Sequence, residues 1–182
     1  MTFNRKLALA VLLVLTICTS AFIFHNSITK SEESNSTSDS VGEVIKPAAQ
    51  PIFDSIEKSP SKDGLSSFFG FTSYESFIRK SAHVFEFALL GAVLLLLMYV
   101  IKQKLLCELL FMPLFLSMSC AVADEFIQSY GDRTSLVRDV VVDFCGALCG
   151  IAFAMILIAV IRLFAGKRKG KMHAAGRRRS RQ

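Results

Sequence analysis

Residues 79–101 read RKSAHVFEFALLGAVLLLLMYVI, a segment that begins with charged side chains and continues as an almost unbroken apolar run. An α-helix needs about 20 apolar residues to cross the hydrocarbon core of a bilayer, which is ~30 Å thick. Three more runs are similarly long and apolar, so membrane spans are expected at 7–24, about 82–101, about 105–123 and about 140–164. The sequence thus predicts an all-α membrane protein with four transmembrane helices.

The composition supports lipid as the main solvent of the chain. Apolar residues make up 52% of the 182 residues, and the mean hydropathy is +0.47. A soluble domain has about 45–50% apolar residues. The net charge of +6 comes from the segment 166–182, which holds eight basic residues and no acidic one. The remainder has 13 basic and 15 acidic residues, so we expect no nucleic-acid partner.

Basic residues beside the spans predict the orientation of the chain, because Lys and Arg near a span stay on the cytoplasmic side. They occur before the first span (Arg5, Lys6), between the second and third spans (Lys102, Lys104) and in the tail. The expected plan has a cytoplasmic N-terminus (1–6), an extracytoplasmic loop (25–71), a core (72–164) and a basic cytoplasmic tail (165–182).

The extracytoplasmic loop is rich in Ser, Glu and Asp, and its segment Ser31–Ser40 has no apolar periodicity, so we expect part of it to be disordered. At its end, Thr72-Ser73-Tyr74-Glu75 matches a capping box. In this motif the Thr72 hydroxyl and the Glu75 side chain satisfy backbone amides at the start of a helix. We therefore expect a helix to begin here and to continue into the second span.

Polar and charged side chains gather at the expected outer ends of the last three spans. They are Arg79, Lys80, His83, Glu86, Asp124, Glu125, Gln128, Arg133 and Asp139. An ionisable side chain at the bilayer centre costs about 2.5–3.5 kcal/mol, so such groups normally face the bundle interior. One interpretation is that opposite charges pair only to hold the helices together. We favour a functional pocket, because glycine and alanine packing could hold a bundle without bringing so many ionisable groups into lipid.

A stripe of polar and small residues follows the fourth span at helical spacing. It consists of Asp139, Asp143, Gly146 and Gly150. Small residues four apart let a neighbouring backbone approach closely. We expect Asp143, Gly146 and Gly150 to serve helix packing. A similar stripe on the third span, formed by Ser117, Ala121, Asp124 and Gln128, is expected to face it.

Familiar catalytic motifs are missing from the sequence. There is no glycine-rich phosphate loop, no Gly-x-Ser-x-Gly elbow and no His-Glu-x-x-His pair. His83 with Glu86, Asp124 and Glu125 could in principle hold a divalent metal, but three carboxylates and one imidazole fit many arrangements. The sequence therefore predicts no bound metal and no cofactor.

The order of these motifs resembles the VanZ-like family of small bacterial membrane proteins. Residues 79–86 look like its Arg-Lys-x-x-His-x-x-Glu motif, and residues 124–128 look like its Asp-Glu-x-x-Gln motif. The match continues through Arg133, Asp139, Gly146 and Gly150. Two positions depart from or vary within the pattern: Asp132 stands where the family usually has Gly, and Asp143 stands where Asn or Asp is expected.

The resemblance implies a multi-pass protein of the bacterial cell membrane, in a family named for a member associated with resistance to the glycopeptide teicoplanin. Our first hypothesis is a non-enzymatic envelope protein that binds a cell-wall or lipid-linked anionic head group. In that hypothesis Arg79, Lys80, His83 and Arg133 contact the head group. The alternative is an enzyme acting on such a lipid, with Glu86 or Asp124 as general base and His83 as acid.

Overall fold

The computed structural model describes residues 3–28, 43–55, 73–102, 106–129 and 137–179. Four long helices form a bundle: α1 (Phe3–Ile28), α4 (Tyr74–Lys102), α5 (Leu106–Gln128) and α6 (Val137–Arg179). Each contains a segment long and apolar enough to cross a membrane, namely Phe3–Ile28, Ser76–Ile101, Leu109–Gln128 and Val137–Phe164. The prediction of an all-α chain with four such helices is confirmed.

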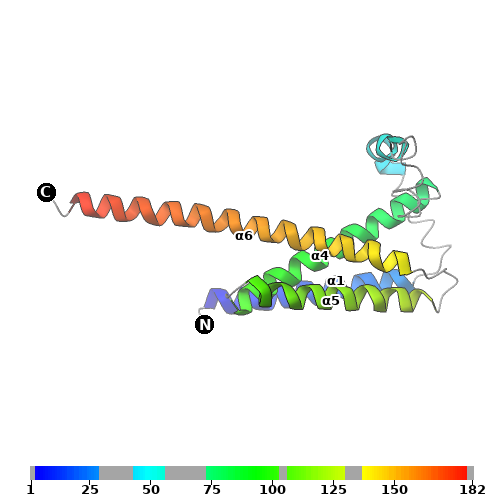
Figure 1. Ribbon diagram of the computed structural model, residues 1–182, viewed down its shortest axis with the longest axis horizontal. Helices are drawn as coiled ribbons and strands as arrows, with labels where there is room; N and C mark the ends of the chain where they lie inside the picture. Colours follow the sequence, from blue (N-terminus) through cyan, green and yellow to red (C-terminus); the bar gives the residue numbers. More distant parts are fainter. Residues whose placement is uncertain (1–2, 29–42, 56–72, 103–105, 130–136, 180–182) are drawn as a thin grey trace.

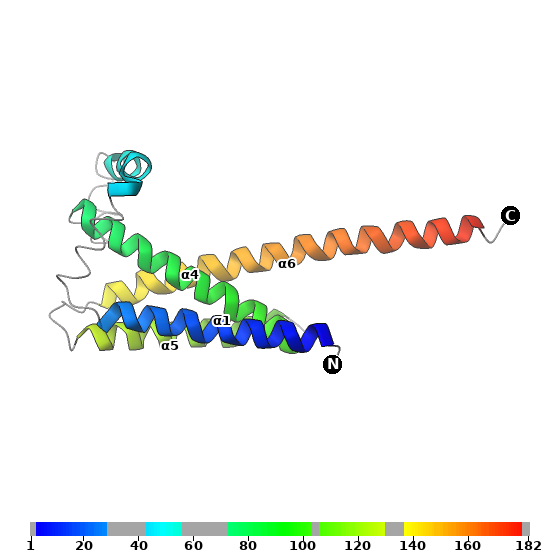
Figure 2. The same ribbon diagram turned by 180° about the vertical axis from the view of Figure 1, so that it is seen from behind.

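Helix α4 is the centre of the bundle and contacts α1, α5 and α6. The C-terminal ends of α1 and α5 lie at the same end of the bundle as the N-terminal ends of α4 and α6 (Figures 1 and 2). We call this the polar end. Helix α6 extends far beyond the opposite end of the bundle (Figure 1).

Glycine lets α4 and α6 pack backbone against backbone. A Cβ at Gly150 would lie 1.8 Å from the carbonyl oxygen of Ala88, and one at Gly146 would lie 2.5 Å from that of Val84. On α4, a Cβ at Gly91 would meet the carbonyl oxygen of Ala147 at 2.4 Å. The glycines of α6 therefore face α4, whereas the sequence led us to expect that their stripe faces the third span.

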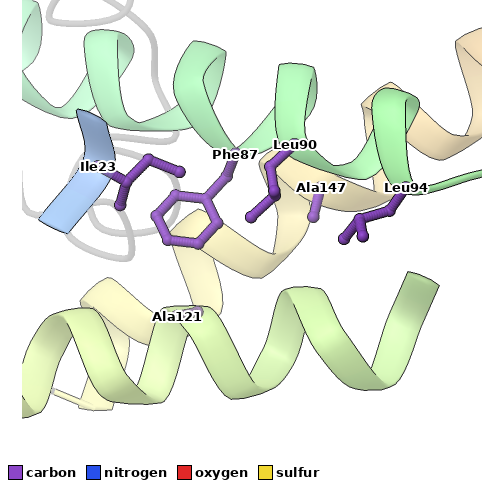
Figure 3. Close-up of a cluster of buried hydrophobic side chains, with 6 residues drawn as sticks. All are labelled: Ile23, Phe87, Leu90, Leu94, Ala121 and Ala147. Atoms are coloured by element: carbon purple, nitrogen blue, oxygen red, sulfur yellow. The ribbon is translucent and has the colours of Figure 1, made fainter. Parts of the chain in front are cut away.

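A cluster of buried apolar side chains fills the interior below the polar end (Figure 3). Phe87, Leu90 and Leu94 of α4 lie among Ile23 of α1, Ala121 of α5 and Ala147 of α6. A second cluster continues toward the opposite end and consists of Leu95, Leu109, Ile151, Ala154 and Ile158. All four helices contribute to the first cluster. Their packing there fixes the mutual positions of the residues at the polar end.

The outer surface of the bundle is apolar, as a bilayer requires. Large apolar side chains remain exposed on every helix, for example Val14 (57%), Phe85 (71%), Phe111 (66%) and Phe153 (66%). In water such a surface would be costly, at roughly 25 cal/mol for each Å² of apolar area. A lipid environment removes that cost, which supports a multi-pass membrane protein.

Side chains at the end opposite the polar end also join helices. The Arg5 guanidinium donates hydrogen bonds to the carbonyl oxygens of Val100 (3.0 and 2.8 Å) and Ile101 (2.9 Å). These carbonyls belong to the last turn of α4, which has no intrahelical donors for them. Arg162 of α6 donates to the Tyr99 hydroxyl at 3.2 Å and lies 5.1 Å from the centre of its ring.

Several boundaries differ from the prediction. Helix α1 continues to Ile28, beyond the expected end of the first span at residue 24, and residues 43–55 of the expected loop are helical. Phe53 of that short helix packs against Tyr74 and Phe77, with ring centroids 5.9 and 5.6 Å away. A helix here was not predicted. The proposed disorder of Ser31–Ser40 lies outside the described residues.

The start of α4 is capped by Ser73. Its hydroxyl accepts a hydrogen bond from the Ser76 amide at 3.2 Å, and its carbonyl accepts one from the Phe77 amide at 3.0 Å. This satisfies an amide that the first helical turn leaves without a partner. The helix thus begins one residue later than the predicted capping box implies, with Ser73 in the capping position that the sequence assigned to Thr72, which lies outside the described residues.

Candidate functional site

Asp124 is the central side chain of the polar end and is fully buried, with 0% of its surface exposed. Its Oδ1 accepts a hydrogen bond from the Ser27 hydroxyl of α1. Its Oδ2 accepts one from Gln128 Nε2, one turn later on α5, at 2.7 Å. Two donors from two helices therefore hold this carboxylate in one orientation.

His83 and Asp143 approach Asp124 from the other two helices. His83 Nδ1 of α4 lies 4.0 Å from Asp124 Oδ2, an ion-pair distance that is too long for a direct hydrogen bond. Asp143 of α6 is buried at 4% exposure. One nitrogen of His83 and one oxygen each of Asp124 and Asp143 lie within 4.8 Å of one another. Three helices thus contribute one side chain each to a compact triad.

The interior of the polar end is strongly acidic. Besides Asp124 and Asp143, Glu125 is buried at 5% exposure. The carboxylates that repel Asp143 are those of Asp124, Glu125, Asp139 and Glu86. Like charges so close together in a low-dielectric interior are unfavourable unless protons or cations accompany them.

Glu86 lies at the edge of this interior, on the same face of α4 as His83. Its Oε1 accepts a hydrogen bond from Asn26 Nδ2 of α1 at 2.9 Å. Its Oε2 is buried and accepts no hydrogen bond from any residue that the structure describes. Glu86 therefore keeps one carboxylate oxygen available to a bound group.

An ion pair joins α4 and α6 near their N-terminal ends. Lys80 Nζ lies 2.6 Å from Asp139 Oδ1, and the two side chains are 14% and 27% exposed. Arg79 and Arg138 are half-buried nearby along the same helices. Arg133, which the sequence assigned to the pocket, lies outside the described residues.

A groove opens beside Glu86 between α1 and α4. It has a volume of about 430 Å³ and is lined by Cys18, Thr19, Phe22, Ala82, Phe85, Glu86 and Leu89. Among the residues that the structure describes, Glu86 is the only charged one that lines the groove. Phe22 and Phe85 are 56% and 71% exposed, so the groove lies on the outer face of the bundle.

Comparison with protein-family models places the chain in a family whose description is VanZ/LLP1, over residues 9–159. The chain belongs to the VanZ/LLP1 family. The match covers most of α1, all of α4 and α5, and α6 as far as residue 159. No curated protein and no solved structure is significantly similar to the chain.

The VanZ/LLP1 match includes two site residues that the sequence analysis missed, Asn26 and Ser27. They were assigned to the loop because the apolar run ends at Phe24. A signal was present: Thr19, Ile23 and Ser27 follow one another at four-residue spacing, and all three are buried. That periodicity continues the helix by one more turn and points Ser27 toward the interior.

Most of the pocket residues expected for this VanZ/LLP1 chain meet within the polar end. Side-chain contacts join Lys80 with Asp139, His83 with Asp124, and Asp124 with Gln128. Asp143 was expected to serve helix packing alone, yet its carboxylate also stands beside His83 and Asp124. Packing of Gly146 and Gly150 against α4 brings Asp143 to that position.

Proposed function

We propose that this VanZ/LLP1 protein resides in the bacterial cell membrane and binds a lipid with an anionic head group, such as a lipid-linked cell-wall precursor. The observation that carries the proposal is the position of Glu86. It belongs both to the apolar groove between α1 and α4 and, through Asn26, to the polar end. An amphiphile needs such a junction, with one surface for its chain and another for its head.

The groove supports the chain-binding half of the proposal. Its volume of about 430 Å³ lies within the range of about 300–1,000 Å³ that is usual for small-molecule sites. Its lining is almost wholly apolar and opens on the face of the bundle that lipid would cover. A lipid chain could therefore enter sideways from the bilayer.

Basic side chains support binding of an anionic head group. Arg79 stands one turn before Ala82 and so continues the groove-lining face of α4 toward the polar end. Lys80 and Arg138 lie at the same end of the bundle. Guanidinium groups bind phosphate and carboxylate with two parallel hydrogen bonds, which suits Arg79 to a head-group anion.

Filling the groove tests this proposal. We expect the wild-type protein, purified in mild detergent, to retain an anionic lipid that native mass spectrometry identifies, and Ala82→Phe to lose it. Ala152→Phe is the matched control, because Ala152 is also exposed but lies on α6 away from the groove. Equal lipid retention by Ala82→Phe and wild type would refute chain binding in the groove. The mass also distinguishes a bulk phospholipid from a lipid-linked precursor.

An enzyme acting on the bound lipid is the second candidate function. The observation that favours it is the meeting of an imidazole and two carboxylates from three helices, since such groups can move protons during a reaction. Here Glu86 or Asp124 would act as base and His83 as acid. Release of a head-group product from the co-purified lipid by wild type, and its loss in Glu86→Gln at normal abundance, would support catalysis. A teicoplanin susceptibility test of a deletion strain addresses any link to resistance.

A further inference from the structure

His83, Asp124 and Asp143 form a cluster of potential metal ligands within the polar end. Each comes from a different helix, α4, α5 and α6, and one donor atom of each lies within 4.8 Å of the other two. In a tetrahedral site with bonds of about 2.0–2.2 Å, the donor atoms lie roughly 3.3–3.6 Å apart. Shifts of about 1 Å, within the reach of side-chain rotation, therefore bring all three onto a common ion.

Asp143 supplies an independent reason to expect a bound cation. It is 4% exposed, and no residue that the structure describes donates a hydrogen bond to its carboxylate. Its oxygen is directed at Asp124 and His83, and the neighbouring carboxylates repel it. A buried carboxylate needs a proton, an ion pair or a metal.

We propose that His83, Asp124 and Asp143 bind one divalent transition-metal ion of the Zn²⁺ or Mn²⁺ type. An imidazole with two carboxylates suits these ions, whereas Mg²⁺ and Ca²⁺ prefer oxygen ligands alone. Two carboxylates neutralise the charge of the ion, and the neutral imidazole adds a third ligand without adding charge. Three protein ligands leave a further coordination position open.

The hydrogen bonds of Asp124 fit the role of a positioned metal ligand. Ser27 donates to one oxygen and Gln128 donates to the other. Each carboxylate oxygen has two lone pairs, so both retain one for a cation. Partners of this kind orient metal ligands in proteins, and their removal typically weakens metal binding about 10–100-fold. Ser27 and Gln128 are therefore positioning residues.

The metal site stands independently of lipid binding, because the groove contributes none of its ligands. If the protein binds both the metal ion and the lipid, the positive charge of the ion also explains how an anionic head group can approach an acidic interior. The open coordination position would accept a phosphate or carboxylate oxygen of the head group. The ion would add positive charge directly beside the buried carboxylates of Asp124 and Asp143.

Metal content of the full-length protein tests the proposal. Purified protein is saturated with Zn²⁺ or, separately, Mn²⁺, desalted into chelator-treated buffer and measured by inductively coupled plasma mass spectrometry. We expect about one ion per wild-type chain, and at least a ten-fold loss of affinity in His83→Gln and Asp143→Asn. The matched control is Asp139→Asn, one turn earlier on the same helix and paired with Lys80, which should keep its metal.

Adding metal ions to the wild-type protein tests for a metal site even if the variants fail to fold. Stripped wild-type protein should unfold at a higher temperature after Zn²⁺ is added, because the ion binds the native state, and Co²⁺ should give a visible absorption spectrum. No retained ion and no thermal shift would overturn the proposal in favour of a protonated Asp143. Equal loss of metal in Asp139→Asn and Asp143→Asn would overturn the ligand assignment. Lipid retention is measured separately on chelator-treated protein, so failure of one proposal is distinguishable from failure of the other.

Discussion

Replacing Gly150 by alanine tests whether the contact between α4 and α6 holds the polar end together. The new Cβ would lie 1.8 Å from the Ala88 carbonyl oxygen, whereas ordinary van der Waals contact begins at 3.4 Å, so the backbones must separate by about 1.6 Å. Backbone cannot rotate away as a flexible side chain can. We expect a loss near the upper end of measured overpacking costs, about 3 kcal/mol.

The other two glycines make this a graded test. At Gly91 and Gly146 the added Cβ would lie 2.4 and 2.5 Å from backbone oxygen, so each requires a smaller separation and should cost about 1–2 kcal/mol. The free energy of unfolding in detergent micelles is measured with a denaturant series. Ala152→Val, on the exposed face of α6, is the control and should change it little.

The result that would refute this reasoning is a free energy of unfolding of Gly150→Ala equal to that of wild type. A reversed order, with Gly146→Ala more damaging than Gly150→Ala, would also contradict the observed contact. The consequence extends to the site, because α4 holds His83 and α6 holds Asp143. Separating the two helices should therefore lower metal retention even in the fraction that remains folded.

Three further predictions concern orientation and the helix contacts. Cysteines placed by Ser38→Cys and Ser135→Cys in a Cys-free chain should both react with an impermeant reagent on intact cells, and labelling of only one would contradict the proposed four-span orientation. Ser27→Ala should lower the free energy of unfolding by about 1–3 kcal/mol, because a buried carboxylate loses a donor; an unchanged value would argue against that hydrogen bond. Arg5→Ala should cost about 1–2 kcal/mol through the carbonyls at the end of α4, while Lys6→Ala, which is exposed, should be near neutral; equal effects would contradict this role.

The long helices were predictable because a membrane span depends on local properties. Residues 79–101 are apolar over enough length to cross a bilayer. The bilayer sets this length, whichever helices pack beside the span. The end of α1 was less predictable, since Asn26 and Ser27 are polar and read as loop. They are helical because their side chains find carboxylate partners on α4 and α5, which are tertiary contacts.

The sequence by itself determined the number of long apolar helices and the family, and it indicated that His83, Glu86 and Asp124 share one end of the bundle, although it missed Asn26 and Ser27. Periodicity and length are properties of a single helix, and alternating helix direction brings those residues to one end. Only the tertiary structure decided which helix faces which. The glycines of α6 pack on α4 because the backbone of α4 fits against them at Val84 and Ala88, and this contact directs Asp143 toward His83 and Asp124. A helical stripe marks a face as suited to packing, but the shape of the partner selects what meets it.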